Sequence, residues 1–273
     1  MRHAYSVAAV RAAEHTLLAQ QNHADELMRL AARGVAATAT AMLAPGQRVT
    51  ILSGPGGNGG DGLYAGAFLA EEGYSVAAIL AADAAHEPAL QAFTGAGGTI
   101  TERLGEADLL IDAVAGLAST RGLSGAPLRA YTEAKERGVP VLAVDIPSGI
   151  NADTGVAAAG AVEADVTISF GWARAGHIFA PECGAVVLCD LRLPGAPRSF
   201  AEELSATAEP VGYIANEPTI PLPYQWPTEP VLSGEQGLVT APKPVGCTGP
   251  ILDPTPGATS TKDTGGVTPV CAG

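Results

Sequence analysis

A run of nine residues, Gly54 to Gly62, contains six glycines together with Asn58 and Asp61. It follows the apolar run Val49 to Leu52, which is typical of a buried strand, and it precedes a helix-like stretch that begins near Leu63. Glycine permits positive φ and lets backbone N–H groups approach a ligand with no Cβ in the way. The run therefore predicts a strand–loop–helix unit whose loop binds an anionic or polar ligand at the helix N-terminus.

The sequence of this loop can be compared with the known classes of glycine-rich binding site. A Walker A loop ends in Lys followed by Ser or Thr, whereas this loop continues as Asp61-Gly62-Leu63, which argues against a P-loop NTPase. Three of its glycines satisfy the dinucleotide pattern G-x-G-x-x-G, and Asp83 lies where a ribose-binding acid is expected. That weak pattern keeps an NAD-dependent dehydrogenase as an alternative. A plain turn capped by Asp61 is the simplest alternative.

Hydrophobic periodicity predicts an α/β protein. Helical spacing of Ala, Leu and Met runs from Val7 to Leu43, with Asn22 or Asp25 as a cap between two helices. Continuous apolar runs, typical of strands buried on both faces, then alternate with helical stretches, which favours a mostly parallel sheet with right-handed crossovers. The expected strands are Val49 to Leu52, Ser75 to Leu80, Leu109 to Val114, Val139 to Val144, Val166 to Phe170 and Ala185 to Cys189. The expected helices are Leu63 to Glu72, Glu87 to Gly95 and Pro127 to Arg137.

The chain changes character near Ser199. Residues 199–273 contain 12 of the 21 prolines and only two basic residues. Proline breaks helix interiors and cannot donate to a strand ladder. We therefore expect one domain over residues 1–198 and a Pro/Gly/Thr-rich tail over 199–273 that is extended or disordered, with no second catalytic domain.

Composition limits the partners. The formal net charge of −13, without a basic stripe, argues against nucleic acid. The sequence has no long unbroken apolar run and no signal-peptide pattern, so we expect no membrane association and a cytoplasmic location. The four cysteines, Cys183, Cys189, Cys247 and Cys271, lack C-x-x-C spacing, which argues against a zinc or redox site.

Polar residues stand at the ends of several expected strands, where an open α/β sheet forms its crevice. Asp112 closes one strand, and Asp145 and Ser148 follow the next. A buried carboxylate needs a cation, donors or a proton. Asn58, Asp112 and Ser148 together offer an amide oxygen, a carboxylate and a hydroxyl, a set that predicts a K⁺ site. The alternative is that each Asp only caps the helix that follows.

Taken in order, these segments resemble the NAD(P)H-hydrate epimerase family over roughly residues 5 to 195. The resemblance rests on Gly54 to Gly62, Asp112-Ala113, Asp145-Ile146-Pro147-Ser148-Gly149, Phe170-Gly171 through Gly176-His177, and Asp190 to Pro194. It implies a Rossmann-like three-layer αβα sandwich, commonly dimeric, with an N-terminal helical lead. It also implies epimerisation of the R and S forms of hydrated NADH or NADPH (NADHX, NADPHX) at nicotinamide C6, before a separate dehydratase acts.

Carried over residue by residue, the resemblance implies a substrate site and a cation site. The implied substrate-binding residues are Gly57, Asn58, Gly59, Gly60, Asp61, Gly116, Leu117, Ala118, Ser119, Thr120, Arg121, Gly122 and Asp145. The implied K⁺ ligands are Asn58, Asp112 and Ser148. Inversion at a carbinolamine-type carbon needs a proton donor for the departing hydroxyl, and we expect Asp145 or Asp112 to exchange that proton.

The sequence departs from the family pattern in three segments. Gly57 stands where Asn is common, Ala118 stands where a second Gly is common, and Arg174-Ala175 replaces a frequent Lys-Pro. Arg keeps the positive charge but cannot act as a neutral base. Arg174 reads either as a site charge or as a solvated surface charge, and the lone His177 reads more readily as structural than catalytic. A non-catalytic binding or scaffold protein on the same fold stays as the alternative to an enzyme.

Overall fold

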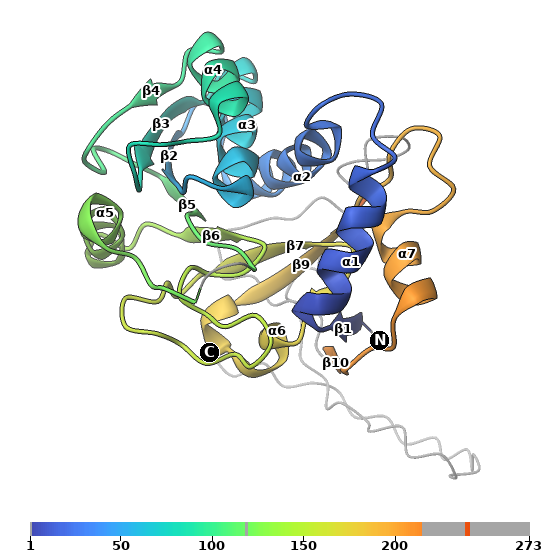
Figure 1. The fold of residues 1–273 in the computed structure, drawn as a ribbon. Helices are drawn as coiled ribbons and strands as arrows, with labels where there is room; N and C mark the ends of the chain where they lie inside the picture. The colour runs from blue at the N-terminus through green and yellow to red at the C-terminus, as the bar shows by residue number, and fades with distance from the viewer. Residues whose placement is uncertain (1, 118–119, 215–237, 241–273) are drawn as a thin grey trace, which may run out of the picture.

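The structure is a computed structural model, and it describes residues 2–117, 120–214 and 238–240. Helices and strands alternate along most of the described chain, as Figure 1 shows. The helices are α1 (Val7–Leu18), α2 (Glu26–Met42), α3 (Gly57–Glu71), α4 (Glu87–Gly95), α5 (Gly125–Glu136), α6 (Gly176–Phe179) and α7 (Phe200–Thr207), with a 3₁₀ turn at Pro181–Cys183. The strands are β1 (Arg2–Tyr5), β2 (Arg48–Ser53), β3 (Ser75–Leu80), β4 (Thr99–Ile100), β5 (Leu109–Ala113), β6 (Val141–Val144), β7 (Val166–Phe170), β8 (Ala173–Arg174), β9 (Ala185–Asp190), β10 (Gly212–Ile214) and β11 (Leu238–Thr240).

The main sheet has the order β11-β9-β7-β6-β5-β2-β3-β4. All of its pairings are parallel except the one between β11 and β9. Chain order runs outward in both directions from β2, through β3 to β4 on one side and through β5 and β6 on the other. This is the arrangement of doubly wound nucleotide-binding sheets, and it confirms the predicted fold class.

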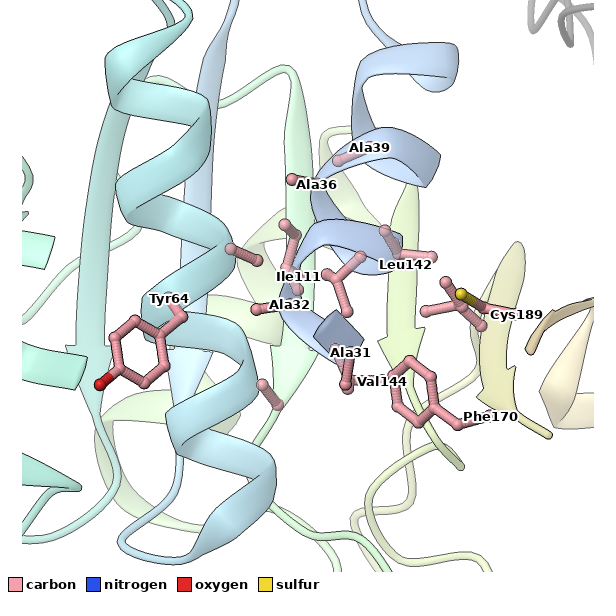
Figure 2. Close-up of a cluster of buried hydrophobic side chains, with 14 of the residues drawn as sticks. Ala31, Ala32, Ala36, Ala39, Tyr64, Ile111, Leu142, Val144, Phe170 and Cys189 are labelled. Carbon is pink, nitrogen blue, oxygen red and sulfur yellow. The ribbon is translucent and has the colours of Figure 1, made fainter. Parts of the chain in front are cut away.

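Helices cover both faces of the sheet. Successive side chains of a strand point to opposite faces, and in these strands the residues on both faces are apolar. Ile111 of β5 packs in the larger cluster with α1, α2, α3, α4 and α7, whereas its neighbour Leu110 packs on the opposite face with α5. Figure 2 shows the small side chains of α2 lying against Ile111, Leu142 and Cys189. Alanine and glycine allow this close approach: a Cβ on Gly34 of α2 would lie 2.8 Å from the sulfur of Cys189.

Three features of the fold differ from the sequence-based expectations. The helix expected from Leu63 begins six residues earlier, at Gly57, so that Asn58 and Asp61 lie within α3. A small second sheet, of order β10-β1-β8, was not expected. It joins the N-terminus to Arg174 and to residues 212–214.

The third difference is the segment after residue 198. The expectation of an extended or disordered tail was wrong for residues 199–214, because α7 and β10 form there. Ser199 and Glu202 form a reciprocal capping box at the start of α7, and Phe200 and Leu204 are buried in the larger core cluster. The S-x-x-E spacing was the sequence signal for this helix. Residues 215–237 and 241–273 lie outside the described residues.

Candidate functional site

The order of the sheet places the glycine run beside the Asp112 segment. β2 is hydrogen-bonded to both β3 and β5, so the strand order reverses beside it, and ligands of open α/β sheets bind outside the carboxyl ends of the strands at such a point. The N–H of Gly54 donates to the carbonyl of Ala113 at 3.0 Å. The segments that follow β2 and β5 therefore lie side by side.

The glycines of the run have two different roles. A Cβ on Gly54 would lie 2.0 Å from the carbonyl oxygen of Val114, and one on Gly59 would lie 1.8 Å from the carbonyl oxygen of Gly54, so close packing of backbone requires both glycines. A Cβ on Gly56 would meet nothing within 4 Å, and one on Gly57 would meet only a Met28 methyl group at 3.9 Å. The open side of the run is thus at the N-terminus of α3, where unpaired backbone N–H groups favour an anion.

Asp112 and Ser148 form a buried hydrogen-bonded pair. The backbone N–H of Ser148 donates to Oδ2 of Asp112 at 2.7 Å, and the Ser148 hydroxyl donates to Oδ1 at 2.7 Å. The N–H of Val114 also donates to Oδ1, at 3.3 Å, and Ser148 Oγ accepts from the N–H of Ala115 at 3.0 Å. Burial raises the pKa of Asp112, and the hydrogen bonds from Ser148 and Val114 oppose that rise.

Asn58 lies next to the segment that follows β5. Its side-chain oxygen is 3.4 Å from the position that a Cβ on Gly116 would occupy. Its Nδ2 atom is buried and has no hydrogen-bond partner among the described residues. The structure thus joins Asp112 to Ser148 directly and places Asn58 beside Gly116, four residues after Asp112.

Asp145 follows β6 and forms a buried ion pair with Arg174. The guanidinium of Arg174 donates a hydrogen bond from Nε to Oδ1 of Asp145 at 2.9 Å, and its Nη2 atom lies 2.7 Å from the same oxygen. Its Nη1 donates to the carbonyl oxygens of Phe170 and Trp172. The Arg174 side chain is only 2% exposed, so its interpretation as a solvated surface charge was wrong.

The backbone of Asp145 is held in an unusual conformation. Its φ is +65°, a left-handed value that is uncommon for a residue other than glycine. His177 accepts a hydrogen bond at Nδ1 from the N–H of Arg174, at 3.0 Å, and its Nε2 lies 2.9 Å from the carbonyl oxygen of Asp145. Nε2 therefore carries the proton and donates it. Burial, followed by the charge of Arg174, lowers the pKa of His177 to about 3, so the ring is neutral and links the two residues structurally.

Two further carboxyl groups lie near Asp145. Burial raises the pKa of Asp61 on α3 well above its usual value, and the charges of Asp145, Glu14 and Asp25 raise it further. Burial also raises the pKa of Glu14 on α1, with Asp145 next in effect. Glu14 was missed from the sequence. The available signal was its position one turn from the buried residues Val10 and Leu17.

The segment expected along the substrate begins beside the N-terminal half of α1. Arg11 donates from Nη2 to the carbonyl oxygen of Leu117 at 3.2 Å, and a Cβ on Gly122 would lie 2.2 Å from the carbonyl oxygen of Ala159. Thr120 and Arg121 are exposed, whereas Ala118 and Ser119 lie outside the described residues. Asp83, the acid of the dehydrogenase alternative, is exposed on the loop after β3.

Within the described ranges, no three His, Cys, Asp or Glu side chains are grouped so as to hold a metal ion. The Asn58, Asp112 and Ser148 set is of a different, oxygen-donor kind with one carboxylate. In the same part of the chain, no helix is both long and apolar enough to cross a bilayer.

Fold and site together define a Rossmann-like α/β protein with a polar site at the switch point of its sheet. The family model described as YjeF-related protein N-terminus matches residues 24–176. This chain therefore belongs to that family, which confirms the resemblance seen in the sequence.

Two relatives and one solved structure are examples of proteins that are similar to this chain. The bifunctional NAD(P)H-hydrate repair enzyme Nnr of Corynebacterium glutamicum is 37% identical over 238 residues, and the match covers 75% of this chain but 42% of that protein. The NAD(P)H-hydrate epimerase of Microbacterium testaceum is 41% identical over 206 residues, which are 70% of this chain and 78% of that protein. The crystal structure of yeast ynu0 is similar in fold, with a TM-score of 0.63 and 19% identity, over 77% of this chain and 96% of that one.

Proposed function

We propose that this protein epimerises hydrated NADH or NADPH at nicotinamide C6, an isomerase reaction that repairs damaged cofactor. The relatives named NAD(P)H-hydrate epimerase and NAD(P)H-hydrate repair enzyme support the activity. The observation that carries the proposal is the gathering of Asp61, Asp145 and the buried Asp112–Ser148 pair around the carboxyl ends of β2, β5 and β6. A scaffold has no need for converging carboxyl groups that are costly to bury.

In this proposal the open N-terminus of α3 binds the phosphate groups. The N–H groups of residues 57–59 precede the first helical hydrogen bond, which Gly60 makes to Gly56, so they are free to donate to an anion. The substrate then extends along residues 116–122 and places its nicotinamide near Asp145. Only Oδ1 of Asp145 is bound by Arg174, which leaves Oδ2 available to face the ring.

The residues present fit a K⁺ ion at Asn58, Asp112 and Ser148. The buried Nδ2 atom of Asn58 lacks an acceptor in the described part of the chain, and rotating the amide by a half-turn would place Oδ1 there, which is a ligand for a hard cation. Ser148 Oγ donates one hydrogen bond and accepts one, so one lone pair is free. A bound K⁺ would offset the charge of Asp112 and attract the electron-rich groups of the substrate.

The sequence left Asp112 and Asp145 as alternative groups for proton exchange, and in this proposal the two residues have different roles. Asp112 is fully buried and accepts three hydrogen bonds, which suits a residue that organises the cation site. Asp145 is the carboxylate that faces the reacting carbon, where its negative charge would stabilise a cationic intermediate. The S epimer would then pass to a dehydratase, and we propose that the protein acts as a homodimer.

The test is to follow one purified epimer of NADHX towards the R/S equilibrium by chromatography, with K⁺ or with Na⁺ at equal ionic strength. We expect a rate well above the uncatalysed rate and a faster reaction in K⁺. Asp145→Asn should reduce the rate at least tenfold, whereas Glu71→Gln, at the exposed end of α3, should not change it. An uncatalysed rate with the wild-type protein would refute the proposal. Hydride transfer with intact NAD⁺ would instead favour the dehydrogenase alternative.

A further inference from the structure

Asp145 lies at the centre of a strained turn directly after β6. The N–H of Ile146 donates to the carbonyl oxygen of Val144 at 2.9 Å, which closes a three-residue turn around Asp145. The φ of +65° at the central residue makes this a γ-turn of the rare, strained kind. A residue other than glycine keeps such a conformation only where its surroundings hold it there, and strain of this kind is concentrated at functional sites.

Both backbone polar groups of Asp145 are bound. Its N–H donates to the carbonyl oxygen of Ile168 on β7 at 2.7 Å, and its carbonyl oxygen accepts from Nε2 of His177 on α6 at 2.9 Å. The first bond continues the ladder between β6 and β7. The second comes from outside the main sheet, so the bond from His177 sets the direction of the peptide group that follows Asp145.

We infer that His177 is a positioning residue that holds Asp145 in this turn and thereby directs its carboxylate towards the substrate. The inference rests on the proposed function, in which Asp145 faces the reacting carbon. It extends that function to a residue outside the proposed substrate site. His177 itself contacts no reacting atom and transfers no proton.

The imidazole ring of His177 joins the two residues of the buried ion pair through their backbones. Its Nδ1 accepts from the N–H of Arg174 at 3.0 Å, so this nitrogen carries no proton and Nε2 is the donor to Asp145. The side chain must therefore accept on one side and donate on the other. An apolar ring of similar size would leave two buried backbone groups unpaired, which is costly.

Arg174 alone does not fix the direction of the Asp145 carboxylate. Nε and Nη2 of Arg174 both contact Oδ1, and the hydroxyl of Ser169 donates to the same oxygen at 3.4 Å. Contacts gathered on one oxygen fix the position of that atom but not the plane of the carboxylate. Arg174 is also held independently of Asp145, since its Nη1 donates to two backbone carbonyl oxygens. The backbone of Asp145 must therefore decide where Oδ2 points, and His177 holds that backbone.

The short helix α6 gives His177 a fixed support. The N–H of Gly176 donates to the carbonyl oxygen of Ala152 at 2.6 Å, and the N–H of Ala175 donates to the carbonyl oxygen of Tyr5 on β1 at 3.0 Å. The start of α6 is thus bound both to the loop that follows Ser148 and to the small sheet. Neither anchor involves Asp145, so α6 can hold the turn in place from outside it.

Two amide side chains that differ by one methylene group test the inference. His177→Asn keeps an acceptor near the position of Nδ1 but is too short to reach the carbonyl oxygen of Asp145, whereas His177→Gln can make both bonds. With NADHX as substrate, kcat should fall at least about tenfold in His177→Asn, while KM changes by less than about threefold. In His177→Gln, kcat should stay within about threefold of wild type.

Thr167→Val is the matched control for lost stability. It removes a buried hydrogen bond, from Oγ1 of Thr167 to the carbonyl oxygen of Cys183 at 2.7 Å, on the strand beside β6 but without touching Asp145. It should lower the melting temperature, as His177→Asn does, and leave kcat within about twofold of wild type. A kcat in His177→Asn that matches Thr167→Val, or a loss in His177→Gln as large as in His177→Asn, would overturn the inference.

A crystal structure of His177→Asn gives a measurement that does not depend on activity. The φ of Asp145 should leave the left-handed region, and its Oδ2 should move. A positive φ with the carboxylate unmoved would overturn the inference even if kcat falls. If His177→Asn does not fold, the same measurements on His177→Phe, which fills the space of the ring without either bond, decide the question. A wild-type protein without epimerase activity would remove the proposed function, whereas the crystal structure would still show whether His177 holds the turn.

Discussion

Arg174 binds a single carboxylate oxygen of Asp145, Oδ1, through a hydrogen bond from Nε at 2.9 Å and an ion-pair contact from Nη2 at 2.7 Å. The contacts neutralise the buried charge at Oδ1, while Oδ2 has no hydrogen-bond or ion-pair partner among the residues that the structure describes. A lysine, with a compact ammonium in place of a planar fork, does not reproduce this arrangement together with the bonds to Phe170 and Trp172. Arg174 therefore holds the Asp145 carboxylate in place and does not exchange protons.

Removing the cation of this pair should be costly. Arg174→Met leaves the Asp145 carboxylate buried without its partner, and we expect the free energy of unfolding to fall by about 3–5 kcal/mol in urea titrations. Adding Asp145→Asn to that variant should recover part of the loss, because the uncompensated charge is removed. Equal losses in the single and double variants would show that the charge of Asp145 is not what makes the single variant unstable.

His177 should make stability depend on pH. Its pKa is about 3 in the folded protein against an ordinary value of 6.5, so unfolding takes up a proton between these limits. Its stabilising effect is complete above pH 6.5 and is lost as pH falls towards 3, at about 1.4 kcal/mol per unit. His177→Gln can keep both hydrogen bonds but cannot titrate. The difference in unfolding free energy between wild type and variant should therefore shift in favour of the variant from pH 7 to pH 5.

The two roles of the glycines can be separated by two alanine substitutions. Gly59→Ala places a Cβ against the carbonyl oxygen of Gly54 and should cost about 3 kcal/mol or more, or prevent folding. Gly56→Ala meets open space and should change stability by less than about 0.5 kcal/mol. If the open side binds phosphate groups, Gly56→Ala should nevertheless raise KM. A similar stability for both variants would contradict the assigned close contacts.

Ser148→Ala tests the proposed cation site. It removes a hydrogen bond to Asp112 and leaves the N–H of Ala115 unpaired, at a cost of about 1–3 kcal/mol. Wild-type protein should melt at a higher temperature in K⁺ than in Na⁺ at equal ionic strength, because a ligand that binds only the folded state stabilises it. This difference should be lost in Ser148→Ala. A difference of the same size in both proteins would place any K⁺ site elsewhere.

The capping box of α7 tests whether the segment after residue 198 is part of the folded domain. Ser199→Ala removes the acceptor for the N–H of Glu202 and should lower the unfolding free energy by about 0.5–2 kcal/mol. The melting temperature should fall by roughly 2–4 °C per kcal/mol. Ser199→Thr keeps the acceptor and serves as the matched control. Melting temperatures that coincide for both variants and wild type would argue against the helix.

The sequence by itself determined the fold class and the order of the site segments. Strands such as β3 and β7 lie at the predicted residues, because an apolar run buried on both faces needs no knowledge of its neighbours to be recognised. The nearness of Asp112 and Ser148 also followed, since strand ends of a parallel sheet share one edge, whereas the hydrogen bond between them was not predicted. Local patterns of this kind are fixed by periodicity and by turn chemistry.

Only the tertiary structure decided what surrounds each charge. Arg174 reads as a surface residue or a site residue until β8 pairs with β1 and buries it against Asp145, a contact between positions 29 residues apart. Glu14 gains its place only when α1 packs over strand ends that are distant in sequence, and Phe200 becomes a core residue only when α7 packs against α1. Burial and charge proximity depend on such long-range packing, which no local window of sequence contains.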